Sequence, residues 1–141
     1  MGSQRTYYGG GIFSEFLYEP IDGMDFTYNG IKCRVLKLQT DNAGTHSSIP
    51  QFAKTSNVYL VLGTDNKPKQ MAIYENHRLV KDFDWTHAHT NAGDGQHFQK
   101  GVVHVHLDVS HSTNARYMNN DEIAKYGAII QHYSPNAKLR P

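Results

Sequence analysis

Runs of apolar residues through the middle of the chain have the length and the alternation that are typical of β-strands. Asn29-Gly30 stands between two such runs, at 26–28 and 31–38, and this dipeptide predicts a two-residue hairpin turn. Three further strands are expected at 57–63, 70–75 and 78–85, joined by short polar turns. Because short connections favour antiparallel neighbours, these segments predict an antiparallel meander.

The segment 101–109 predicts one more strand, and its two sides differ in chemistry. Successive side chains of a strand point to opposite faces of the sheet. The side expected to face the core is apolar and carries Val103, Val105, Leu107 and Val109. The opposite side carries Val102, His104, His106 and Asp108. The pattern therefore predicts a polar site, built mainly from histidine, on the second side.

A helix is expected near the C-terminus, over 119–133, where apolar residues recur with helical spacing. Asn119 is the expected N-cap, and Glu122, three residues on, completes a pattern close to a capping box. Pro135 ends the helix. The fold class expected is α+β, with a single antiparallel sheet of about five or six strands and the C-terminal helix packed on it. Residues 1–141 are expected to form one domain, with 1–12 poorly ordered.

Two segments predict loops. The segment 40–54 is polar, and 86–100 carries Gly93 and Gly95 without the period of a strand or a helix. A loop of this length is uncommon inside a compact domain unless it has a function. The segment 86–100 is therefore expected to contribute to a site.

Charge and composition narrow the function classes. The net charge of the 141 residues is +1 with histidines neutral, so the chain lacks the overall positive field of a non-specific DNA-binding protein. A role with nucleic acid would need a local site. No apolar run approaches the ~20 residues of a membrane span. Cys33 is the single cysteine, and its apolar surroundings predict a buried hydrophobic side chain rather than a reactive thiol.

Histidine is the compositional outlier, because six of the nine histidines fall between His87 and His111. Four of them form two His-x-His pairs, His87 with His89 and His104 with His106. On a strand, residues two apart lie about 6.7 Å from each other and point the same way. That spacing lets both imidazoles of a pair converge on one ion or one small anion.

Three interpretations of the pairs remain open. Zinc accepts histidine nitrogen, and His87, His89, His104 and His106 could supply its ligands, although His-x-His alone is a weak signature. Metal-free acid/base chemistry on a phosphodiester also needs two histidines, with an aspartate such as Asp84 or Asp108 orienting an imidazole. It needs a cation for the phosphate as well, and the nearby candidates are Lys100, Arg116 and Lys81. In the third interpretation some histidines only bond to their neighbours. The pattern slightly favours metal-free chemistry and leaves the cofactor as none or zinc.

The segment 56–106 resembles the C-terminal domains of bacterial polymorphic toxins and their prophage-encoded relatives. The matching pieces are NVYLVLGTDNKPKQMAIYENHRLVKDFDW, then HAH and HVH, over about a third of the chain. The insert 91–101 departs from the family pattern, which is compact and proline-rich there. The resemblance implies a nuclease-type toxin domain that cleaves RNA and is neutralised by a cognate immunity protein. The site residues that it implies are Asp84, His87, His89, His104 and His106.

The function expected is accordingly that of a histidine-dependent, ribonuclease-like phosphodiesterase of the toxin type, with His104 and His106 as the first acid/base candidates. It would act in the cytoplasm, or in the cytoplasm of a target cell into which it is delivered, and without a membrane partner. The alternative is a non-enzymatic, virion-associated or binding module in which the histidines hold a structural zinc ion. A metal-dependent hydrolase of a small molecule is a third, weaker expectation.

Overall fold

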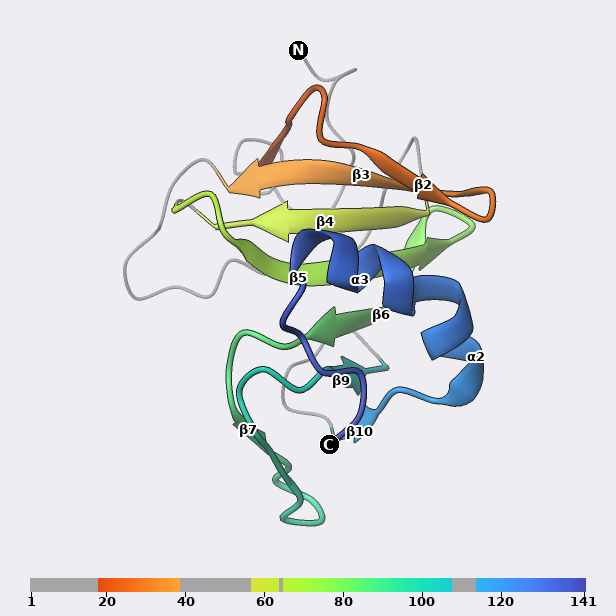
Figure 1. The fold of residues 1–141 in the computed structure, drawn as a ribbon. Helices are drawn as coiled ribbons and strands as arrows, with labels where there is room; N and C mark the ends of the chain where they lie inside the picture. The colour runs from red at the N-terminus through yellow and green to blue at the C-terminus, as the bar shows by residue number, and fades with distance from the viewer. Residues whose placement is uncertain (1–17, 39–56, 64, 108–113) are drawn as a thin grey trace.

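The computed structural model describes residues 18–38, 57–63, 65–107 and 114–141 (Figure 1). Most of them belong to an eight-stranded sheet with the strand order β1-β3-β4-β5-β6-β9-β10, and β2 also pairs with β3. The strands of this sheet are β1 (Tyr18–Pro20), β2 (Phe26–Tyr28), β3 (Ile31–Leu38), β4 (Val58–Leu62), β5 (Pro68–Glu75), β6 (Arg78–Asp84), β9 (His104–His106) and β10 (Ala115–Tyr117). The segment 1–12 and the expected loop 40–54 lie outside the described residues.

The sheet is larger than predicted and is not purely antiparallel. The meander β4-β5-β6 is antiparallel, as its short turns predict. However, β3 runs parallel to β4, with Val35 opposite Leu60. Parallel neighbours need a connection of a dozen or more residues, and the segment between Leu38 and Val58 is long enough. The sequence pattern predicted a polar loop at 40–54 but did not reveal the direction in which β3 would pair.

Two hairpins have the left-handed turns that a two-residue loop requires. Asn29 (φ 50°) and Gly30 (φ 79°) join β2 to β3 and confirm the predicted turn. Asn76 (φ 51°) and His77 (φ 66°) join β5 to β6 in the same way. Positive φ at both positions gives a turn whose twist matches that of the flanking strands.

The C-terminal helix is continuous from Asn120 to Tyr133 and includes one π-helical turn. Its parts are α2 (Asn120–Glu122), the π-turn η2 (Ile123–Gly127) and α3 (Ala128–Tyr133). The capping box is present: Asn119 Oδ1 accepts from the Glu122 N–H at 2.8 Å, and Glu122 Oε1 accepts from the Asn119 N–H at 2.9 Å. None of the helices in the described part of the chain is long and apolar enough to span a membrane.

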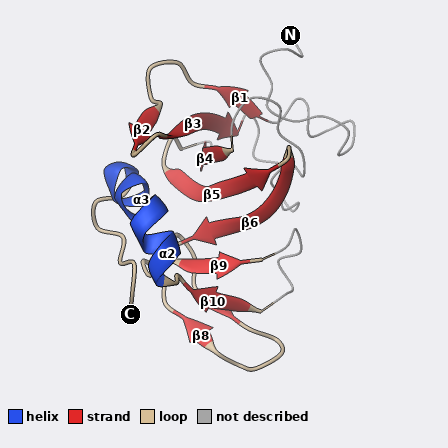
Figure 2. Cartoon of the chain, turned by 90° about the vertical axis from the view of Figure 1, so that its right-hand side faces the viewer, coloured by secondary structure: helices blue, strands red, loops and turns tan. Residues whose placement is uncertain are grey.

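Apolar side chains pack on both faces of the sheet. The helix covers one face (Figure 2), where it closes a core that includes Val35, Leu60, Met71, Ile73, Phe83, Trp85, Val103, Val105, Ile129 and Ile130. Cys33 belongs to this core, and burial raises the pKa of its thiol to about 12, as expected of a buried hydrophobic side chain. The opposite face carries a smaller cluster of Leu36, Tyr59, Val61, Ala72 and Tyr74.

Candidate functional site

Three imidazoles meet on the sheet face opposite the helix. The ring centroids of His89 and His104 lie 5.6 Å apart and the rings are stacked, at an interplanar angle of 12°. His106 stands edge-on to both, at 4.8 Å from His89 and 5.3 Å from His104. One member of the first His-x-His pair and both members of the second therefore share one place, which we call the histidine cluster.

Strand β9 positions two members of the cluster through its register with β6. His104 lies opposite Asp84, and His106 lies opposite Asp82. The predicted alternation is confirmed at Val103 and Val105, which are fully buried in the core on the other face. It is wrong at Leu107, which is 53% exposed because β9 ends at His106. Asp108, Val109 and His111 lie outside the described residues.

The third member comes from the segment that was predicted to be a loop. Within it, β7 (His89–Thr90) and β8 (His97–Phe98) form a short hairpin, which lies beyond the β9–β10 end of the sheet in both views (Figures 1 and 2). The Phe98 ring packs 5.4 Å from the ring of His104 and 4.8 Å from that of Tyr117. This packing brings His89 onto the two histidines of β9.

Asn91 attaches the hairpin to the edge of the sheet. Its side-chain Nδ2 donates to the Ala115 carbonyl at 2.9 Å, and its Oδ1 accepts from the Ala115 N–H at 2.7 Å. These two bonds fix which end of the amide is the acceptor. His89 Nε2 lies 3.0 Å from the same Oδ1, so Nε2 carries a proton. In the neutral ring the lone pair of His89 is then on Nδ1.

The two histidines of β9 are deeply buried, with 1% of His104 and 2% of His106 exposed. His104 Nδ1 lies 3.5 Å from the Val102 carbonyl, which can only accept, so this long bond places the proton on Nδ1. Burial lowers the pKa of His104, and the nearby charge of Asp84 opposes this effect in part. The charges of His89 and His87 lower the same pKa further.

His87 is close enough to act on His104 electrostatically, but it occupies a different environment. Its side chain is 65% exposed, and its Nδ1 lies 3.0 Å from Thr86 Oγ1 and 3.8 Å from Asp84 Oδ2. Asp84 Oδ1 in turn accepts from the Thr86 backbone N–H at 2.9 Å. Asp84 thus lies near His87 and acts on His104 through its charge, and its orienting role stays a prediction.

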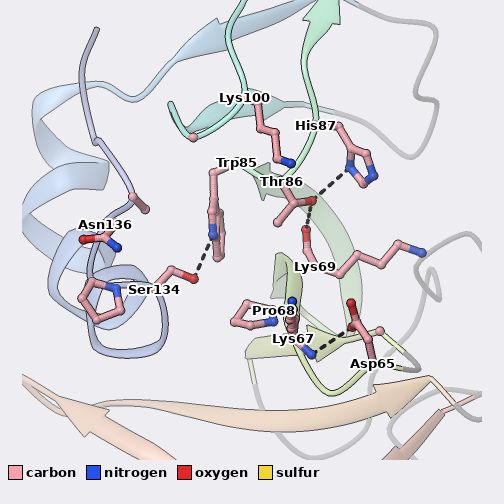
Figure 3. A pocket seen from close by; sticks show the side chains of 14 residues that line it. Asp65, Lys67, Pro68, Lys69, Trp85, Thr86, His87, Lys100, Ser134 and Asn136 are labelled. Atoms are coloured by element: carbon pink, nitrogen blue, oxygen red, sulfur yellow. Dashed lines mark hydrogen bonds between the residues drawn. The ribbon is translucent and has the colours of Figure 1, made fainter.

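His87 lines a cavity of about 1030 Å³, which the other three paired histidines do not line. The cavity lies between the start of β5, the end of β6, the turn at Lys100 and the segment that follows the helix (Figure 3). Its lining residues are Gly63, Asp65, Lys67, Pro68, Lys69, Trp85, Thr86, His87, Lys100, Gly101, Ser134, Pro135, Asn136 and Ala137. Trp85 is buried in its wall and donates its indole N–H to Ser134 Oγ at 3.0 Å.

Three side chains could supply the cation for a phosphate, and two of them bind a buried carboxylate instead. Glu122 accepts from Arg116 through both oxygens, at 2.7 and 2.9 Å, and from Lys81 Nζ at 2.7 Å. These partners hold the pKa of the Glu122 carboxyl down at about 2, against the opposing effect of burial. Arg116 and Lys81 therefore stabilise the fold, and Lys100 is the candidate that lines the cavity.

The histidine cluster does not have the geometry of a zinc site. Among the residues that the structure describes, no group of three or more His, Cys, Asp or Glu side chains could hold a metal ion. Zinc needs in-plane nitrogen lone pairs that converge on one point at about 2.0–2.1 Å. The rings of His89 and His104 are stacked and nearly parallel, so their in-plane lone pairs lie in two separate planes and do not converge on one point. The expected ligand set His87, His89, His104 and His106 does not fit the ion.

Sequence reasoning missed Asn91, Thr86, Lys67 and Lys69. Asn91 acts through contacts 24 residues away, which no local pattern reveals. Thr86 precedes the first His-x-His pair, and the two lysines lie in a turn, where charged residues are ordinary. The one available signal was the unusual length of the segment 86–100.

The comparisons with known proteins found no match. No protein-family model matches the chain, and neither a curated protein nor a solved structure matches it.

Proposed function

We propose that this chain is a histidine-dependent phosphodiesterase that cleaves RNA, of the toxin type that the sequence resemblance implies. The observation that supports the proposal most is the arrangement around Asp84. Asp84 Oδ2 lies 3.8 Å from Nδ1 of the exposed His87, and the charges of Asp84, His87 and His89 all act on His104. The segment that carries His87 and His89 therefore brings two imidazoles near the histidines of β9, and two-histidine acid/base catalysis needs two such groups.

The burial of His104 and His106 moves the proposed acid/base roles to His87 and His89. A substrate can reach the exposed ring of His87 and the half-buried ring of His89, but not rings that are 1–2% exposed. In our proposal His104 and His106 are positioning residues, because their rings pack against the ring of His89.

The hydrogen bonds of the outer pair suggest which histidine is the base. His89 keeps its proton on Nε2, facing Asn91, so its Nδ1 can take a proton from a ribose 2′-hydroxyl. Nδ1 of His87 lies near Thr86 Oγ1 and Asp84 Oδ2, so in our proposal its exposed Nε2 gives a proton to the leaving 5′-oxygen. The 2′-oxygen then bonds to phosphorus as the bond from phosphorus to the 5′-oxygen breaks. The products are a 2′,3′-cyclic phosphate and a 5′-hydroxyl.

The experiment measures cleavage of an RNA oligonucleotide by His87→Gln and His89→Gln. Each change should reduce kcat/KM by about 10²–10⁴-fold, the usual contribution of a positioned acid or base. His132→Gln, an exposed histidine on α3 of the other sheet face, is the matched control and should retain activity within about threefold.

Two results would contradict the proposal. One is full activity of His87→Gln, because the exposed imidazole is then not needed. The other is equal cleavage of the corresponding DNA strand, which has no 2′-hydroxyl to attack phosphorus.

A non-enzymatic binding module is the second candidate, and the burial of His104 and His106 favours it. Two histidines packed among Phe98, Tyr117 and each other can serve simply to hold the hairpin on the sheet. Tight RNA binding with no cleavage at any pH between 5 and 9 would favour this candidate. A cognate immunity protein belongs only to the first proposal, where it would cover the cavity beside His87.

A further inference from the structure

The lining of the cavity beside His87 carries more positive than negative formal charge. Lys67, Lys69 and Lys100 line it together with a single carboxylate, Asp65, so the lining carries a formal charge of +2 with His87 neutral. The whole chain carries only +1, so the cavity concentrates positive charge that the rest of the molecule balances. A cavity walled by low-dielectric protein focuses such a field.

Lys67 and Lys100 form no ion pair with a carboxylate among the described residues, in contrast to several other lysines and arginines. Lys81 and Arg116 bind Glu122, Lys125 pairs with Asp121, and Lys32 pairs with Asp25. Asp65 does not neutralise Lys67, because the contact between them is from the Lys67 backbone N–H to Asp65 Oδ1, at 3.0 Å. Both ammonium groups are therefore available to a ligand in the cavity.

The cavity has polar side chains on both sides of Trp85 and some apolar surface. Figure 3 shows Lys100, Thr86 and His87 on one side of Trp85, and Ser134 and Asn136 on the other. Pro68, Pro135 and the buried indole of Trp85 add apolar surface. The volume of about 1030 Å³ slightly exceeds the ~300–1,000 Å³ range for small-ligand sites, so a nucleotide unit fits.

We propose that this cavity binds a backbone phosphate of RNA through Lys67 and Lys100 and so places the adjoining ribose beside His87. The inference rests on the proposed function and deepens it by assigning the substrate-binding site. Lysine binds phosphate as a point charge and without base specificity, so the site would accept any RNA sequence. It also supplies the cation that two-histidine chemistry needs, in place of Arg116 and Lys81.

The test measures binding rather than cleavage, so that it stands apart from the catalytic proposal. The probe is a fluorescent 2′-O-methyl RNA oligonucleotide, which has no free 2′-hydroxyl and is not cleaved by the proposed mechanism. The double variant Lys67→Ala/Lys100→Ala should weaken binding at least tenfold at 50 mM salt. The slope of log affinity against log salt should fall by about 1.4, since each lost contact to a single strand contributes ~0.7.

The matched control is Lys32→Ala/Lys125→Ala, which removes the same charge from exposed lysines outside the cavity. Its affinity should stay within about twofold of the parent. Equal weakening by both double variants would overturn the proposal, because binding would then follow net charge alone. Unchanged binding by the cavity variant would also overturn it.

A second arm distinguishes RNA from a free nucleotide. A nucleoside 5′-monophosphate should compete with the oligonucleotide at least 100-fold more weakly than unlabelled oligonucleotide does. If it competes equally well, and loses its effect in Lys67→Ala/Lys100→Ala, the cavity is a mononucleotide site and RNA is the wrong ligand. Normal lysine-dependent binding by a protein that cleaves nothing would refute the catalytic proposal and leave this site standing.

Discussion

At the scale of one residue, Glu122 shows which contacts a local sequence pattern predicts and which it does not. The spacing from Asn119 to Glu122 predicts a capping box, and both bonds of that box are present. The same spacing gives no sign that Lys81, 41 residues earlier, and Arg116 converge on this carboxylate. A helix cap is local in sequence, whereas a buried ion pair depends on how the helix packs against β6 and β10.

The buried carboxylate predicts a specific acid sensitivity. Because its pKa is about 2 in the folded protein and 4.5 as a model group, ionised Glu122 stabilises the fold fully above pH 4.5. That contribution, on the order of 3 kcal/mol, is lost as the pH falls from 4.5 to 2. The difference in the free energy of unfolding between the parent and Glu122→Gln should therefore shrink over this range, as measured by urea denaturation.

Asp121→Asn is the control for this prediction, because Asp121 is the neighbouring acid and is 69% exposed. It should change the free energy of unfolding by less than about 0.5 kcal/mol. A difference between parent and Glu122→Gln that stays constant from pH 5 to pH 2.5 would show that the carboxylate titrates normally.

His104 and His106 also show that a local pattern does not predict contacts with distant parts of the chain. The alternation of β9 correctly places His104 and His106 on the face away from the helix. It does not say whether that face is open, and the two side chains are in fact 1–2% exposed. Periodicity assigns a side chain to a face, but what covers the face comes from elsewhere in the chain.

At the scale of elements, the β7–β8 hairpin is what covers His104 and His106. Its sequence has glycines and no strand period, so it predicts a loop, and the loop does turn at Gly95 with φ 73°. The hairpin exists because Asn91 bonds to the Ala115 backbone and Phe98 packs on His104. Strands of two residues held by distant contacts leave almost no trace in the local sequence. By contrast, the meander and the helix can be predicted from the sequence, since their patterns of apolar residues are long and regular.

Replacing Asn91 should loosen this hairpin. Asn91→Ala removes both partners of the Ala115 peptide groups and leaves a buried donor and acceptor unsatisfied. The expected loss is about 1–3 kcal/mol in the free energy of unfolding. The Ala115 amide should also exchange with solvent faster in hydrogen-exchange measurements. Asn136→Ala, at an exposed asparagine, should change stability by less than about 0.5 kcal/mol. Unaltered protection of Ala115 would mean that the strand pairing holds the edge without Asn91.

At the scale of the molecule, the cavity is assembled from segments that lie far apart in the sequence. The Lys138 N–H donates to the Gly101 carbonyl at 2.8 Å, and the Val103 N–H donates to the Lys138 carbonyl at 2.9 Å. These bonds hold the segment after the helix against the turn that carries Lys100. The sequence predicts that any nucleic-acid site must be local, because the net charge is +1. It cannot predict where the lysines gather, because that depends on the closure of the C-terminal segment.

The whole-molecule arrangement also predicts how the protein responds to metal removal. A structural zinc ion contributes its binding free energy to folding, so a chelator would lower the melting temperature steeply if the histidines held one. In the described part of the chain the rings of His89 and His104 are stacked, and bonds to Asn91 and Val102 satisfy one nitrogen of each. Packing with Phe98, rather than a shared ion, then holds the cluster together.

We therefore expect excess EDTA to shift the melting temperature by less than about 1 °C, whereas Phe98→Ala should cost about 3–5 kcal/mol, as loss of a fully buried phenylalanine does. Elemental analysis of the purified protein is the companion measurement. Near-stoichiometric zinc together with a large chelator-induced loss of melting temperature would reverse this conclusion, because the imidazoles would then be ligands whose arrangement around the ion differs from the stacked one.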